Sequence, residues 1–149
     1  MPDYRKNHKD ETGLHVLVLA QDMTDEVYRL LTKQITVTNE NGEKQKIELF
    51  PKRTRWLTGV RLAEKCDELL DLIRDANALP TNVPSLMTKR TEEAFEAYAT
   101  AKKIAGSIND VQRRQHLSLD YFKNWARLYN IMLPALKSWA NSHLNNNQK

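Results

Sequence analysis

Basic residues are the side chains of this sequence whose types and spacing could do chemistry, and seven of them form two groups. The first group is Lys52, Arg53 and Arg55, which follow Pro51 where a helix is expected to begin. The second group lies between the last two expected helices: Arg113, Arg114, His116 and Lys123. Arginine presents a planar fork of N–H donors that matches a phosphate group, so such clusters are typical of sites that bind the backbone of nucleic acids.

The first group of cations does not stabilise the helix that it precedes. A helix start carries partial positive charge and favours acids, so Lys52, Arg53 and Arg55 oppose the dipole. The second group has a simpler explanation, because the end of a helix favours cations. Two interpretations follow, a phosphate-binding end or a merely solvated basic end. The first is favoured if the fold brings both groups together.

Three more cations extend the candidate site. Lys89 and Arg90 lie at an expected helix start and oppose its dipole, and Lys103 lies on a polar face. Glu92 and Glu96 dilute the charge of that face, so a solvated ion-pair surface is the competing interpretation. The net charge is +4, and its positive excess falls within residues 50–149, which carry 16 basic and 10 acidic side chains.

Patterns typical of catalysis or metal binding are missing from the sequence. It contains no glycine-rich phosphate loop, HExxH or GxSxG. None of its histidines follows a glutamate by three positions, as a di-metal site in a helical bundle requires. The single cysteine, Cys66, excludes an internal disulfide and is interpreted as core packing. We therefore expect a protein that is not an enzyme and has no metal or cofactor.

The composition fits one mainly helical domain. A chain of 149 residues with 40% hydrophobic side chains can form one core, and 4 glycines and 5 prolines favour long helices. The longest apolar run, residues 14–20, is far shorter than the roughly 20 residues of a membrane span. The polar N-terminal segment, 1–13, lacks the order of a secretory signal, so a cytoplasmic protein without membrane contact is expected.

Apolar residues at spacings of three and four predict four helices. The expected elements are a helix over 14–34, a helix from 54 to about 77, a helix that follows an N-cap at Ser85 and ends near 114, a helix after an N-cap at Ser118, and a polar tail over 143–149. The stripe of the second helix begins with Trp56 and Val60. Pro134 falls inside the fourth helix and should bend it.

The pattern changes between the first two helices. The β-branched run at 35–38, the turn pair Asn41–Gly42 and the alternation at 46–49 predict a β-hairpin insertion over 35–49. An isolated hairpin is marginal in water, so this one should pack against the helices or a neighbouring subunit. We expect residues 1–149 to form one all-α domain, an up-down-up-down antiparallel four-helix bundle with this insertion. In such a bundle the two cation groups share one end.

Several stretches resemble the accessory variability determinants, which are four-helix-bundle accessory proteins of diversity-generating retroelements. The similar stretches are Phe50–Pro51–Lys52–Arg53 with Arg55 and Gly59, the run at 69–73, the run at 101–105, and Leu117–Ser118–Leu119–Asp120–Tyr121 through to Ser138–Trp139. The same fold occurs in small bundle proteins encoded in ribosomal-RNA intervening sequences. The hairpin insertion, Pro134, and Ala99 in place of an arginine are departures from the family pattern.

The resemblance implies a basic homopentamer that binds RNA or DNA and a dedicated reverse transcriptase. Such a protein supports mutagenic retrohoming without catalysing it. The family's basic positions carry over to Lys52, Arg53, Arg55 and Lys103. The alternative function is a structural or regulatory bundle that contacts only proteins, and salt-dependent binding separates the two.

An oligomer is also favoured by the aromatic content. The three tryptophans, Trp56, Trp125 and Trp139, exceed what one small core readily buries. We therefore expect at least part of this aromatic surface to be covered by another copy of the chain.

Overall fold

A computed structural model describes residues 12–147 of the chain. Most of the predicted polar segment over 1–13 therefore lies outside the described residues. Its last two residues belong to the start of the first helix, because the Thr12 side chain accepts a hydrogen bond of 3.1 Å from the backbone N–H of His15. Thr12 thus caps a helix that begins at Gly13.

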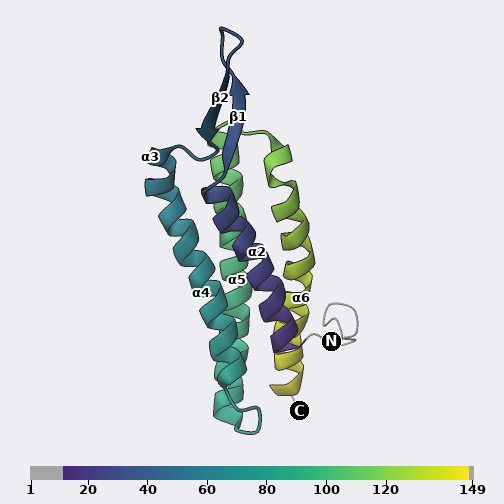
Figure 1. Cartoon of the computed structure of the whole chain (residues 1–149). Coiled ribbons are helices and arrows are strands. Elements are labelled where there is room, and N and C mark those ends of the chain that lie inside the picture. Colours follow the sequence, from purple (N-terminus) through teal and green to yellow (C-terminus); the bar gives the residue numbers. More distant parts are fainter. Residues whose placement is uncertain (1–11, 148–149) are drawn as a thin grey trace.

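The described residues are mostly helical, with one small antiparallel sheet, as the sequence predicted. The long helices are α2 (Gly13–Leu31), α4 (Val60–Ala78), α5 (Pro84–Arg114) and α6 (Lys123–Asn147). The short helix α3 (Lys52–Thr54) and the π-helical turn η1 (Arg55–Gly59) lead directly into α4, and the 3-10 turn η2 (Leu119–Phe122) leads into α6. Helices α2 and α5 each contact both α4 and α6, and their apolar faces meet in one core (Figure 1).

Two connections define the ends of the helix assembly. The β-strands, α3 and the connection from α5 to α6 lie at one end, which we call the hairpin end (Figure 1). The connection from α4 to α5 lies at the opposite end (Figure 1). The first turns before α4 and the last turn of α5 are therefore neighbours at the hairpin end, although more than fifty residues separate them in the sequence.

The sheet consists of strands β1 (Gln34–Thr38) and β2 (Lys44–Glu48), with Ile35 opposite Ile47. Its loop is stabilised by Asn39, whose Oδ1 accepts hydrogen bonds from the backbone N–H groups of Asn41 and Glu43. The hairpin projects beyond the helices instead of lying along them (Figure 1). Of its residues, Ile35 packs against the core of the helices, and contact of the rest with a neighbouring subunit stays a prediction.

Only the base of the hairpin is anchored in the core. The backbone N–H of Leu49 donates a 2.8 Å hydrogen bond to the carbonyl of Lys33, and Leu49 and Phe50 are both buried. The ring of Phe50 stacks on that of Phe122, with 6.4 Å between the centroids. These contacts fix the chain just before the first cation group, and they tie it to the start of α6.

The second helix buries only part of the predicted stripe. Trp56 and Val60 were expected in the core, yet they are 71% and 49% exposed. The buried positions are Gly59, Leu62, Cys66, Leu69, Ile73 and Ala76, and the prediction is confirmed at Cys66, Ile73 and Ala76. A π turn has more residues per turn than an α-helix, so it changes which side of the helix after it faces the core. Gly59 also allows close approach of α2, since a Cβ there would lie 3.2 Å from Cδ2 of Leu31.

The third and fourth helices follow the prediction except at their outer ends. Helix α5 starts with Pro84 at its first position, so Ser85 is not its N-cap. Ser118 is a cap, because its side chain accepts a 3.3 Å hydrogen bond from the backbone N–H of Asp120. Helix α6 passes through Pro134 and continues to Asn147, which makes most of the predicted tail over 143–149 helical.

Candidate nucleic-acid interface

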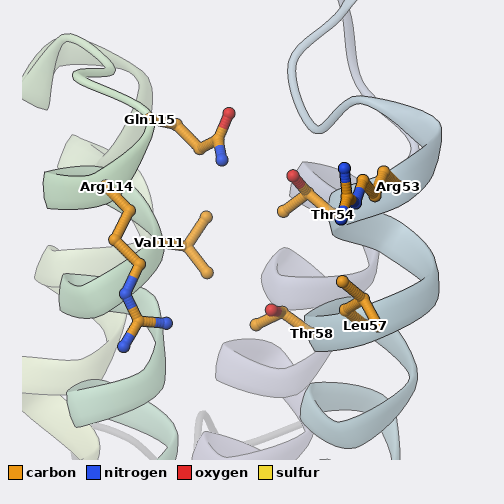
Figure 2. A pocket seen from close by; sticks show the side chains of 7 residues that line it. All are labelled: Arg53, Thr54, Leu57, Thr58, Val111, Arg114 and Gln115. Carbon is orange, nitrogen blue, oxygen red and sulfur yellow. The ribbon is translucent and has the colours of Figure 1, made fainter.

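Cations from both predicted groups line one hollow at the hairpin end, which we call the arginine hollow. It has a volume of about 210 Å³ and is lined by Arg53, Thr54, Leu57, Thr58, Val111, Arg114 and Gln115. Figure 2 shows residues of α3 and η1 on one side and residues of α5 on the other. The side chain of Arg114 runs along α5 beside the gap (Figure 2). The fold therefore brings Arg53 and Arg114 to the same hollow.

Three of the six lysines and arginines in the two groups form ion pairs. The exposed or half-exposed pairs are Arg55 with Glu48 at 2.9 Å, Arg113 with Asp110 at 3.7 Å, and Lys123 with Asp120 at 3.0 Å. Lys52, Arg53 and Arg114 have no ion-pair partner among residues 12–147. Exposed pairs contribute little to stability and exchange readily, so all six remain available to an anionic ligand.

The end of α5 is closed by a backbone motif that holds the second group in place. The backbone N–H of Leu117 donates to the carbonyl of Gln112 at 3.1 Å, and that of His116 donates to the carbonyl of Arg113 at 3.3 Å. His116 has a φ of 51°, in the left-handed region that glycine usually occupies at this position. This hydrogen-bond pattern fixes where the chain leaves α5, and with it the positions of Arg113 and Arg114.

A second hollow is lined by other residues of the same helical turns, on a different side of them, and we call it the tryptophan hollow. Its volume is about 320 Å³, and its lining residues are Lys52, Arg55, Trp56 and Val60. The sequence analysis missed this surface because it placed Trp56 in the core. The run of cations directly before Trp56 is the feature that could have indicated an exposed aromatic residue there.

Lys89, Arg90 and Lys103 do not join the hairpin end. Lys89 and Arg90 lie near the start of α5, at the opposite end, and Lys103 is exposed about halfway along α5. Nucleic-acid binding by Arg90 stays a prediction, and its guanidinium is engaged by two contacts within the chain. Its Nη1 donates to the carbonyl of Leu79 at 3.0 Å, and its Nε donates to Nε2 of His143 at 2.8 Å.

Arg90 and His143 form a structural contact that the sequence analysis did not find. His143 is 4% exposed, and its ring lies edge-on to that of Trp139, with 4.7 Å between centroids. Burial and, secondarily, the charge of Arg90 lower the pKa of His143 to about 4. Burial also lowers the pKa of Arg90. No local spacing indicates this contact, because 53 residues separate the two partners.

The remaining reactive groups take no part in the two hollows. Cys66 is fully buried, and burial together with the charge of Asp67 raises the pKa of its thiol to about 12. It is therefore a neutral core residue, as predicted. No group of three or more His, Cys, Asp or Glu side chains suited to a metal ion occurs within residues 12–147.

The fold and these hollows define a mainly helical protein with a cationic, partly apolar end. No described helix is both long and apolar enough to cross a membrane. No family model, curated protein or solved structure matches this chain. Functional inference therefore rests on the residues at the hairpin end and on the resemblance described above.

Proposed function

We propose that this chain is a non-enzymatic accessory protein that binds RNA or DNA through the cations of its hairpin end. The observation that carries this proposal is the arginine hollow. Arg53 and Arg114 face one hollow without an ion-pair partner among the described residues. Unpaired guanidinium groups that share a concave surface attract phosphate strongly, because each can donate two hydrogen bonds to it.

The proposal extends to the arrangement and the partners of the protein. We propose that the chain forms an up-down-up-down bundle, that five copies assemble into a homopentamer, and that the protein acts in the cytoplasm. Its partner is a reverse transcriptase, which it assists during mutagenic retrohoming. The resemblance to accessory variability determinants supports these parts. The residues that carry this resemblance include Lys52, Arg53 and Arg55, and these three line the two hollows.

Contact with proteins alone is the second candidate function. Trp56 and Leu57 favour it, because they are 71% and 62% exposed and adjacent. A cluster of exposed apolar residues often marks a protein interface. The charges around this cluster favour the first candidate, since the centre of a protein interface is usually depleted in charged residues.

Salt dependence of RNA binding tests the proposed function. We expect the chain to bind a 20-nucleotide RNA at 50 mM salt, and the logarithm of its affinity to fall linearly with the logarithm of salt concentration. Each phosphate contact contributes roughly 0.7 to 0.9 to this slope through counterion release. Fluorescence anisotropy from 50 to 300 mM salt measures it. Absence of binding at 50 mM would exclude RNA as a ligand and leave the protein-contact function.

The oligomeric state is tested by light scattering on the purified chain. We expect the mass of five copies at micromolar concentration. Two of the three tryptophans do not favour an oligomer, because Trp125 and Trp139 are buried within one chain. Exposed Ile131 and Leu144 on α6 remain available for contact between copies. A strictly monomeric mass would contradict the pentamer and leave RNA binding by single chains.

A further inference from the structure

Trp56 is the most exposed of the large apolar residues in the described part of the chain. It is 71% exposed, and none of the described aromatic rings stacks on it. It lies in the π turn η1, between the helix start at Lys52 and the inward-facing Gly59. Single π turns are frequent at functional sites. Since core packing does not require Trp56 here, its exposure needs a different explanation.

We propose that Trp56 is a stacking platform for an unpaired base of a single-stranded nucleic acid; this inference rests on the proposed function. Lys52 and Arg55 line the same hollow and hold the phosphates that flank the stacked base. Stacking on an aromatic side chain tolerates every base, because each has a π face. The tryptophan hollow therefore selects for single strands, without selecting for sequence.

The charge of the tryptophan hollow favours a nucleic acid over a protein as the occupant. Lys52 and Arg55 flank the exposed ring of Trp56 there. This arrangement complements an anionic ligand that also has apolar faces. A duplex does not meet that requirement, since its bases are stacked on one another and only its phosphates and groove edges are accessible.

The two hollows lie on different sides of η1, so the stacking site is the tryptophan hollow alone. Trp56 lines the tryptophan hollow, and Leu57, the next residue, lines the arginine hollow. Arg55 is held by Glu48 in a pair of 2.9 Å, in which both side chains are more than one-third exposed. Such a pair opens at little cost, so Arg55 can exchange the carboxylate of Glu48 for a phosphate.

Binding of single-stranded and duplex RNA to Trp56 variants tests the inference. The probes are a 20-nucleotide oligoadenylate, a 20-base-pair RNA duplex and inorganic polyphosphate. We expect Trp56→Ala to lower affinity for oligoadenylate about 10- to 100-fold, because one stacked base is lost. Its affinity for duplex and polyphosphate should not change, and Trp56→Phe should keep most of the affinity for oligoadenylate.

Leu119→Ala is the matched control, since Leu119 is 69% exposed at the same end of the molecule. It should bind all three probes like the unaltered chain. Oligoadenylate should also quench the fluorescence of the unaltered chain but not that of Trp56→Ala, because Trp125 and Trp139 are buried.

The outcomes separate this inference from the proposed function. If the unaltered chain binds none of the probes at 50 mM salt, the proposed function and this inference both fail. If it binds them and Trp56→Ala binds oligoadenylate equally well, only the stacking platform is overturned. An equal loss of affinity for duplex and single strand also overturns it. So does a fall in oligomeric mass for Trp56→Ala, which would assign Trp56 to contact between copies.

Discussion

Replacing Arg53 and Arg114 together with glutamate is expected to lower RNA affinity about 100-fold at 50 mM salt and to flatten the salt dependence by roughly two units of slope. Both guanidinium groups line the arginine hollow, and neither has an ion-pair partner within the described residues. Their reversal removes two phosphate contacts and adds two charges that repel phosphate. In a homopentamer the change is repeated in every copy.

The matched control is the double variant Arg74→Glu and Lys137→Glu, which changes the net charge equally away from the hairpin end. Both residues are exposed. Fluorescence anisotropy of the two variants across the same salt series measures the difference, and circular dichroism checks that helical content is unchanged. If the hairpin-end variant keeps the affinity and slope of the unaltered chain, the binding site lies elsewhere, with Lys103 as the next candidate.

Stability is expected to fall as the pH is lowered from 6.5 to about 4 because of His143. The pKa of this residue is about 4 in the folded chain, compared with 6.5 for an ordinary histidine. Its stabilising contribution is complete above pH 6.5. It is lost as the pH falls, because the unfolded chain takes up the proton first. The difference corresponds to on the order of 3 kcal/mol of unfolding free energy.

The contact with Arg90 explains the direction of this effect. Nε2 of His143 accepts a hydrogen bond from Nε of Arg90 at 2.8 Å. A protonated imidazole cannot accept that bond, and it would place a second positive charge against the guanidinium. His143→Gln provides an acceptor that does not titrate in this range.

Urea denaturation at several pH values between 4 and 7 measures the contribution. We expect His143→Gln to show a smaller loss of unfolding free energy over this range than the unaltered chain. Asn141→Gln, at an exposed position of the same helix, should keep the pH dependence of the unaltered chain. Identical pH dependence in His143→Gln and the unaltered chain would contradict the role assigned to His143.

Local patterns determined much of the fold without tertiary information. The alanine-rich stripe of α5 is buried as expected, since Ala94, Ala97 and Ala101 are inaccessible to solvent. Ser118 caps the turn before α6, because its hydroxyl oxygen accepts a hydrogen bond from a backbone N–H only two residues further along the chain. The two-stranded antiparallel pairing followed from β-branched residues on either side of a turn. Each of these features depends on residues close together in the sequence.

Contacts between distant residues decided the rest. The sequence identified the cations at 52–55 and 113–114, and the tertiary structure decided that Arg53 and Arg114 share a hollow while Arg55 pairs with Glu48. A helix with apolar residues on more than one side can bury either side, and the approach of α2 at Gly59 turned Trp56 outwards. Arg90 looked like a surface cation until its contact with His143 made it structural, because nothing in local spacing specifies a partner on another helix.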